Sequence, residues 1–124
     1  MTTSDPQLMT IGEFARVTGL TASALRFYAD SGLLLPADID GISGYRRYVP
    51  DQVARARLLR RLREIATPLS TAADILDAAP AEAAQLVDDH VRQLSEDATL
   101  ARDRGARIIA DLVDSRGGAP VSVR

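Results

Sequence analysis

The stretch MTIGEFARVTGLTASALRFYADSGLLLPA, residues 9–37, predicts two short helices joined by a tight turn. Thr10 and Glu13 have the spacing of a capping box, in which each side chain bonds a free backbone amide at the start of a helix. Gly19 is a natural end for this first helix, and Thr21 is a suitable N-cap for a second one. Such a pair has the proportions of a helix-turn-helix, although the pattern also fits any small helical bundle.

The second helix is expected to run from Thr21 to about Asp30, and it carries the consecutive residues Arg26, Phe27 and Tyr28. Aromatic residues make up only 4% of the chain, so this concentration needs an explanation. Ser23 and Arg26 lie three positions apart and share one face of the helix. The two aromatic rings either pack in the core or belong to a contact surface, and the residues alone leave both readings open.

The following segment, PADIDGISGYRRYVP, combines glycines and prolines with a short run of strand-forming residues, and it predicts a small β-hairpin. On a strand, Tyr45 and Arg47 share one face, and Arg46 and Tyr48 share the other. One face must lean on the helices, because so small a hairpin is marginal by itself. The other face can approach a partner.

Residues 51–65, DQVARARLLRRLREI, predict a strong amphipathic helix, and Thr67-Pro68 predicts an N-cap that opens a further helix to about Ala78. In the first of these helices the apolar residues expected to face inward are Val53, Leu58, Leu59, Leu62 and Ile65. The Arg residues expected to be a mixture of phosphate contacts and solvated side chains are Arg55, Arg57, Arg60, Arg61 and Arg63.

The rear of the chain has a regular heptad repeat, which predicts one helix over residues 81–114 that would be roughly 50 Å long. A helix of that length needs a partner, and a second copy of the chain is the simplest one; the alternative is folding back on its own chain. Residues 1–9 and 115–124 are expected to be a flexible N-terminus and a flexible tail or linker. The residues predicted to form the dimerisation seam are Ala84, Val87, Val91, Leu94, Ala98, Ala101, Gly105, Ile108 and Leu112.

Composition narrows the function classes. The 124 residues include no Cys, which excludes disulfides and thiolate metal sites. Residues 1–63 hold nine Arg against six acidic residues, whereas residues 64–124 hold six Arg against eleven, so only the front half suits a polyanion. No stretch approaches the ~20 apolar residues of a membrane span, and a soluble cytoplasmic protein is expected.

A catalytic or metal-binding set is not visible in the sequence. His90 is the only His, and it neighbours Asp88 and Asp89 within the predicted heptad helix. One His with two exposed carboxylates makes a poor metal site, and a solvated helix face is the better interpretation. We therefore expect no enzyme activity, no metal and no cofactor.

Four motifs in order, MTIGEFARVTGLTASALRFYADSGLLLPA, SGYRRY, VARARLLRRLREI and LSTAADILD, resemble the MerR family of bacterial transcription regulators. The resemblance implies a mainly α fold, with a winged helix-turn-helix over residues 10–78 and an antiparallel coiled-coil dimerisation helix over 81–114. The sequence departs from the family pattern at Ala66 and Thr67, where the family usually has Gly and then an aromatic or apolar residue. It also departs at Pro68, where a Ser or Thr cap is common. We expect Thr67 to supply the helix cap there.

The resemblance implies a homodimer that binds an inverted repeat in double-stranded promoter DNA, with RNA polymerase as a candidate partner and distortion of the site as the family mechanism. The residues predicted to contact DNA are Arg16, Thr21, Ser23, Arg26, Phe27, Tyr28, Tyr45, Arg46, Arg47 and Tyr48. The sequence leaves the small-molecule effector unassigned. Three alternatives stay open: a fragment of a longer ligand-sensing regulator, a regulator controlled by a protein partner, and a helical scaffold without a DNA role.

Overall fold

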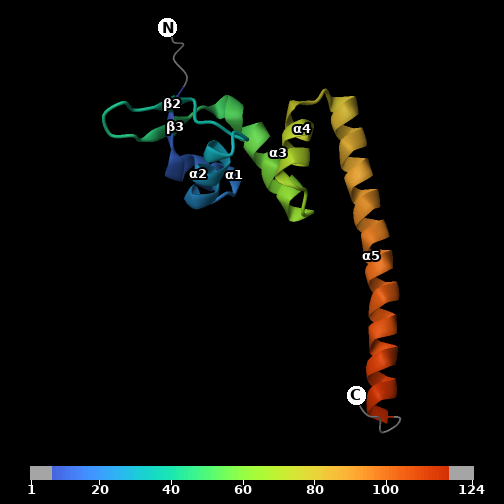
Figure 1. The fold of residues 1–124 in the computed structure, drawn as a ribbon. Coiled ribbons are helices and arrows are strands. Elements are labelled where there is room, and N and C mark those ends of the chain that lie inside the picture. Colours follow the sequence, from blue (N-terminus) through green and yellow to red (C-terminus); the bar gives the residue numbers. More distant parts are fainter. Residues whose placement is uncertain (1–6, 118–124) are drawn as a thin grey trace. The chain divides into compact units, whose positions relative to one another are not determined.

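The computed structural model describes residues 7–117, and the predicted mainly helical fold with a small wing and a long C-terminal helix is confirmed (Figure 1). The chain forms two compact units, a front unit that ends at Leu86 and a rear unit that begins at Val87. In chain order the elements are β1 (Met9–Thr10), α1 (Ile11–Thr18), α2 (Ala22–Asp30), β2 (Asp38–Ile39), β3 (Arg46–Tyr48), a 3-10 turn η1 (Pro50–Gln52), α3 (Val53–Glu64), α4 (Leu69–Asp77) and α5 (Pro80–Gly117).

Local capping fixes the helix-turn-helix, as predicted. The backbone N–H of Thr10 donates to the Glu13 carboxylate at 2.8 Å, and the Glu13 N–H donates to the Thr10 hydroxyl at 3.1 Å. The bond from the Thr10 backbone holds the pKa of Glu13 below its ordinary value. Gly19 ends α1 at φ 80°, a conformation that glycine adopts without strain, and the Thr21 hydroxyl accepts from the Ala24 N–H to start α2.

The wing is a three-stranded antiparallel sheet in the order β1-β3-β2. Met9 pairs with Tyr48, and Ile39 pairs with Arg46. The first strand corrects the prediction that residues 1–9 are a flexible N-terminus, because Met9 is hydrogen-bonded into the sheet; residues 1–6 lie outside the described part of the chain. Two residues are too few for the alternating pattern from which a strand is predicted.

The core of the front unit lies where α1, α3 and the wing meet. The fully buried large side chains include Phe14, Leu25, Leu34, Tyr48, Leu59 and Ile75. On α3 the predicted inward face is confirmed at Leu59 and Leu62, but Ala56 takes a core position that the sequence analysis did not assign.

The connection from α3 to α4 is a helix C-terminus of the Schellman type. The N–H groups of Ala66 and Thr67 return to the carbonyls of Arg63 and Leu62, and Ala66 takes the left-handed conformation at φ 57°. Thr67 is fully buried and does not cap α4, which begins after Pro68 without a side-chain cap. The prediction of a Thr67 cap was therefore wrong, because the α3 terminus directs this side chain inward.

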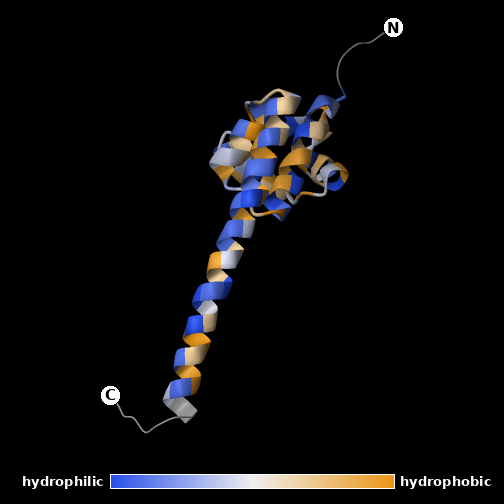
Figure 2. Ribbon diagram, turned by 90° about the vertical axis from the view of Figure 1, so that its right-hand side faces the viewer, coloured by the Kyte–Doolittle hydropathy of each residue, from blue (hydrophilic) through white to orange (hydrophobic). Residues whose placement is uncertain are grey.

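The long helix α5 runs from Pro80 to Gly117, so it starts and ends close to the predicted bounds. Its first residues, to Leu86, belong to the compact front unit. Bands of apolar residues interrupt its polar surface (Figure 2). The predicted tail is helical through Gly117, and residues 118–124 lie outside the described part. No helix within residues 7–117 combines the length and apolarity that crossing a bilayer requires.

Candidate nucleic-acid interface

A basic pocket lies between the second helix and the wing. It encloses about 220 Å³ and is lined by Ile11, Arg26, Gly44, Tyr45 and Arg46. Arg26 is an exposed residue in the middle of α2, whereas Tyr45 and Arg46 come from the hairpin, twenty positions further along the chain. The fold thus brings together the two segments that the sequence analysis assigned to DNA contact.

The guanidinium of Arg46 has hydrogen-bond donors that are not satisfied within the described residues. One of its terminal nitrogens lies 3.7 Å from the Asp30 carboxylate, too far for a good hydrogen bond, and the other is buried without a partner among the described residues. A guanidinium carries five N–H donors in a planar fork that suits phosphate oxygens. The Arg46 side chain is 27% exposed and lines the pocket beside Arg26, so its guanidinium adds positive charge that attracts an anion entering there.

Tyr45 and Arg47 lie together on one face of the wing, as strand geometry predicted. The Arg47 guanidinium carbon lies 5.6 Å from the centroid of the Tyr45 ring, which is the arrangement of a cation–π contact. Tyr45 is 64% exposed, and Arg47 is half-buried. This pair therefore offers an aromatic face with a positive charge next to it.

Burial separates the predicted aromatic contacts into two groups. Phe27 is 50% exposed and free to meet a partner, whereas Tyr28 is 7% exposed and Tyr48 is fully buried. We correct the prediction that Tyr48 contacts DNA, because its side chain has no surface to offer. Tyr28 packs mainly in the core, with its ring tilted against Phe27 at a centroid distance of 5.6 Å.

The smaller polar candidates lie on the helix-turn-helix. Thr21 and Ser23 are exposed at the start of α2, and the Thr21 hydroxyl still has its proton to donate, because it acts only as an acceptor in the cap. Arg16 is exposed as well, but it lines a different pocket, together with Leu8 before β1 and with Glu13 and Val17 of α1. Arg16 is thus not part of the basic pocket.

Most arginines of α3 make hydrogen bonds or ion pairs within the front unit and so stabilise the fold. Arg57 donates to the Val17 carbonyl at 2.9 Å, and Arg60 pairs with Glu64 at 2.7 Å while its chain packs beside Gly19. Arg63 donates to the Thr67 carbonyl at 2.5 Å. Arg55 makes three polar contacts of its own. The expectation of a solvated side chain holds best for Arg61, which is exposed and has no polar contact among the described residues.

Two features of the pocket were missed by sequence reasoning. Ile11 forms part of its wall, and Asp30 holds Arg46 loosely in place. The cap at Thr10 was a signal for the position of Ile11, but nothing in the sequence indicated that Asp30 faces the wing. Within the described residues no group of three or more His, Cys, Asp or Glu side chains could hold a metal ion.

Two helices joined by a tight turn beside a β-hairpin define a winged helix-turn-helix protein. The chain belongs to the MerR HTH family of regulatory proteins, whose family model matches residues 9–79.

Comparison with individual proteins agrees with this assignment. CueR of Escherichia coli O6:H1, an HTH-type transcriptional regulator, is 33% identical over 69 residues, which are 56% of this chain and 50% of CueR. The chain thus spans about half the length of the CueR relatives that it matches. An uncharacterized HTH-type transcriptional regulator of Pseudomonas aeruginosa is 32% identical over 115 residues, covering 86% of this chain and 83% of the relative.

Among solved structures, the chain is similar to HiNmlR, a MerR family regulator lacking the sensor domain, in a crystal structure bound to promoter DNA. The TM-score is 0.57 and the sequence identity 22%, and the match covers 90% of each chain. This likeness shows the shared fold.

Proposed function

We propose that this chain is a DNA-binding transcription regulator that acts as a homodimer on an inverted-repeat site. The observation that carries the proposal is the convergence of Arg26 with Tyr45 and Arg46 in one basic pocket between α2 and the wing. Two segments distant in sequence present positive charge and hydrogen-bond donors to the same space. A phosphate of the DNA backbone is the ligand that such a pocket suits.

The exposed end of α2 supplies the remaining contacts. Thr21, Ser23 and Phe27 lie on the exposed surface of this helix together with Arg26. A helix N-terminus favours anions, and a helix in the major groove reads base edges through its side chains. We assign hydrogen bonds to Ser23 and Arg26 and apolar contact, for example with a thymine methyl group, to Phe27.

The proposed dimer rests on the surface of α5. Large apolar side chains of the predicted seam are exposed in the single chain, with Val91 at 47%, Ile108 at 58% and Leu112 at 56%. Ile109 and Val113 beside the seam are exposed to a similar degree. A helix with so much apolar surface is stabilised by a partner that removes this surface from water.

Charge favours an antiparallel arrangement of the two helices. Residues 82–97 hold five acidic residues and one Arg, whereas residues 98–117, the rest of the helix, hold four Arg and three Asp. In an antiparallel pair the acidic segment of one copy lies beside the basic segment of the other. A parallel pair would place like charges together. Two-fold symmetry then presents two identical heads to an inverted repeat.

The similarity to known regulators also supports the proposal. CueR is named a transcriptional regulator, and the HiNmlR structure holds promoter DNA. RNA polymerase stays a predicted partner that the family resemblance suggests. Distortion of the DNA site also stays a prediction.

The test is selection of bound duplexes from random DNA, followed by affinity measurements at two salt concentrations. We expect an inverted repeat to be enriched. Affinity for the selected duplex should fall by about 10³-fold or more between 50 and 200 mM salt, since neutralised phosphates release counterions. Absence of binding to any duplex at about 50 mM salt, where phosphate contacts are strongest, would overturn the proposal.

A further inference from the structure

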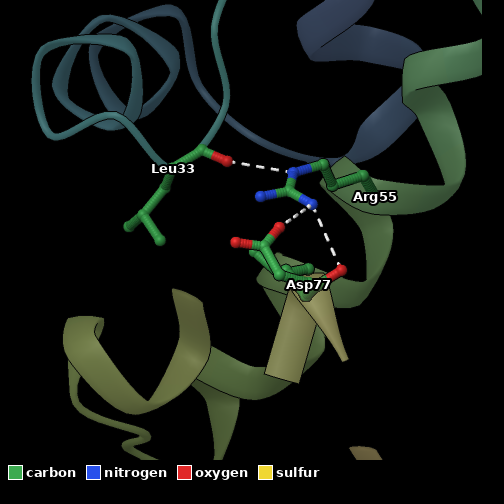
Figure 3. A network of polar contacts seen from close by, with 4 residues as sticks. Leu33, Arg55 and Asp77 are labelled. Carbon is green, nitrogen blue, oxygen red and sulfur yellow. Dashed lines mark hydrogen bonds and ion pairs between the residues drawn. The ribbon is translucent and has the colours of Figure 1, made fainter. Parts of the chain in front are cut away.

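One arginine of α3 links the segment after α2 to the end of α4 (Figure 3). The Arg55 Nε donates to the Leu33 carbonyl at 3.0 Å. Its Nη1 donates to the Leu76 carbonyl at 3.2 Å and lies 3.0 Å from the Asp77 carboxylate. Three acceptors from two distant segments thus share a single guanidinium.

Each acceptor belongs to a segment that matters for the proposed function. The N–H groups of Leu33 and Leu34 both donate to the Tyr28 carbonyl, so the Leu33 segment is tied to the last turn of α2. At the other end, Asp77 is the last residue of α4, and only Ala78 and Ala79 separate it from α5. Arg55 therefore connects the helix proposed to read DNA with the root of the helix proposed to form the dimer.

The chemistry of the contact requires the arginine fork. Leu33 and Leu76 offer neutral carbonyls in different directions, and the planar guanidinium meets both with fixed geometry. The carboxylate of Asp77 is 70% exposed, so its ion pair with Arg55 is screened and contributes less than the carbonyl bonds. A lysine keeps the positive charge, but its single ammonium does not reproduce this arrangement of donors.

We propose that Arg55 is a positioning residue that makes the protein discriminate between DNA sites of different half-site spacing. The proposal rests on the proposed function. The distance between the two heads of a dimer selects the separation of half-sites only if each head is held firmly against its dimerisation helix. Arg55 fixes the end of α4 against the α2 segment, two residues before α5 starts.

The test uses the 124-residue chain with Arg55→Lys, which preserves charge and general attraction to DNA. Arg61→Lys is the matched control, because Arg61 lies on the same helix without a polar contact among the described residues. The probes are duplexes that carry the selected half-sites at the selected spacing, the same half-sites one or two base pairs closer or further apart, and one half-site alone. Affinity is measured for each duplex.

We expect wild type and Arg61→Lys to lose about tenfold or more in affinity when the spacing changes, because the second head no longer reaches its half-site without strain. Arg55→Lys should lose about threefold or less, since its heads adapt, while its affinity for the single half-site stays within about twofold of wild type. Asp77→Ala, at an exposed carboxylate, should change the spacing penalty in the same direction by a smaller factor.

An unchanged spacing penalty in both Arg55→Lys and Asp77→Ala would overturn the proposal. It would also be overturned if Arg55→Lys weakened binding to the single half-site as much as to the full sites, because Arg55 would then be a direct DNA contact. If Arg55→Lys fails to fold, the spacing penalty of Asp77→Ala alone tests the proposal, and an unchanged penalty in that variant overturns it. Failure of the wild type to bind any duplex is a separate result, and it rejects the proposed function itself.

Discussion

The ring of Tyr48 in the wing stacks on the ring of Phe14 in α1, with centroids 4.3 Å apart and planes 7° from parallel. Both side chains are fully buried. The stack fixes β3 against the helix-turn-helix, and because Arg46 lies two positions before Tyr48 on the same strand face, it also holds Arg46 at the basic pocket. Tyr48 thus acts on the proposed interface through packing and not through contact.

Tyr48→Phe tests this assignment. The Tyr48 hydroxyl is buried without a partner among the described residues, so its removal should leave the free energy of unfolding at neutral pH unchanged or raise it by up to about 1 kcal/mol. Affinity for a selected duplex should stay within about twofold of wild type. A large loss of affinity in a normally folded variant would return Tyr48 to the set of DNA contacts.

The same variant should change the alkaline limit of stability. Burial raises the pKa of Tyr48, although the positive charges of Arg46 and Arg26 oppose the shift. The folded state therefore keeps a proton that the unfolded chain releases above about pH 10, and this contribution to stability is lost as pH rises through the folded pKa. Denaturant unfolding from pH 8 upward should show a steeper alkaline loss for wild type than for Tyr48→Phe.

Arg26→Ala should weaken DNA binding while leaving the fold intact, because the exposed side chain lines the basic pocket. We expect a loss of about 1–3 kcal/mol in binding free energy and, for a phosphate contact, a reduced dependence of affinity on salt. Arg61→Ala removes the same charge from a surface outside the pocket and serves as the control. Equal affinities of the two variants would exclude Arg26 from the contact surface.

Ala66→Gly should stabilise the protein. Ala66 holds φ 57° at the end of α3, a conformation that strains residues with a Cβ and that glycine adopts freely. The free energy of unfolding should rise by about 0.5–1 kcal/mol after the larger entropy of the unfolded glycine chain is included. Ala54→Gly, at an exposed position inside α3, should lower it by about 1 kcal/mol. Urea unfolding of both variants gives the comparison, and a destabilised Ala66→Gly would contradict the account.

Two buried threonines should respond in opposite ways to replacement by valine. The Thr67 hydroxyl has no partner among the described residues, whereas the Thr18 hydroxyl donates to the Phe14 carbonyl at 2.8 Å. Thr67→Val should therefore be neutral or stabilising by up to about 1 kcal/mol, and Thr18→Val should cost about 1 kcal/mol. Thermal unfolding of the two variants measures the difference, and a more stable Thr18→Val would refute it.

Local signals predicted much of the fold. The caps at Thr10 and Thr21 and the stop at Gly19 depend on residues within one helical turn, so the sequence indicated them directly. The family resemblance assigned both the Arg26 helix and the hairpin to DNA contact, and the structure brings these segments together. The heptad spacing that predicts a dimerisation seam on α5 is regular over many turns, and the seam itself stays a prediction.

The sequence-based predictions were wrong or incomplete where contacts between distant parts of the chain determine the position of a side chain. Period-2 alternation separates the faces of a strand but does not say which face leans on the helices, so the burial of Tyr48 followed only from its stack on Phe14. The inward side chain of Thr67 depends on how α3 ends. Arg55 looked like one more polar residue on α3, because its acceptors lie about twenty positions away in both directions.

The central claim, two copies of the chain on one duplex, is tested most directly by the mass of the complex with a selected inverted repeat. Light scattering or native mass spectrometry should find two 13.3 kDa chains per duplex. In parallel, Ile108→Asp, which places a charge in the exposed seam of α5, should reduce the free protein to a single chain. One wild-type chain per duplex, or no complex at low salt, would contradict the account.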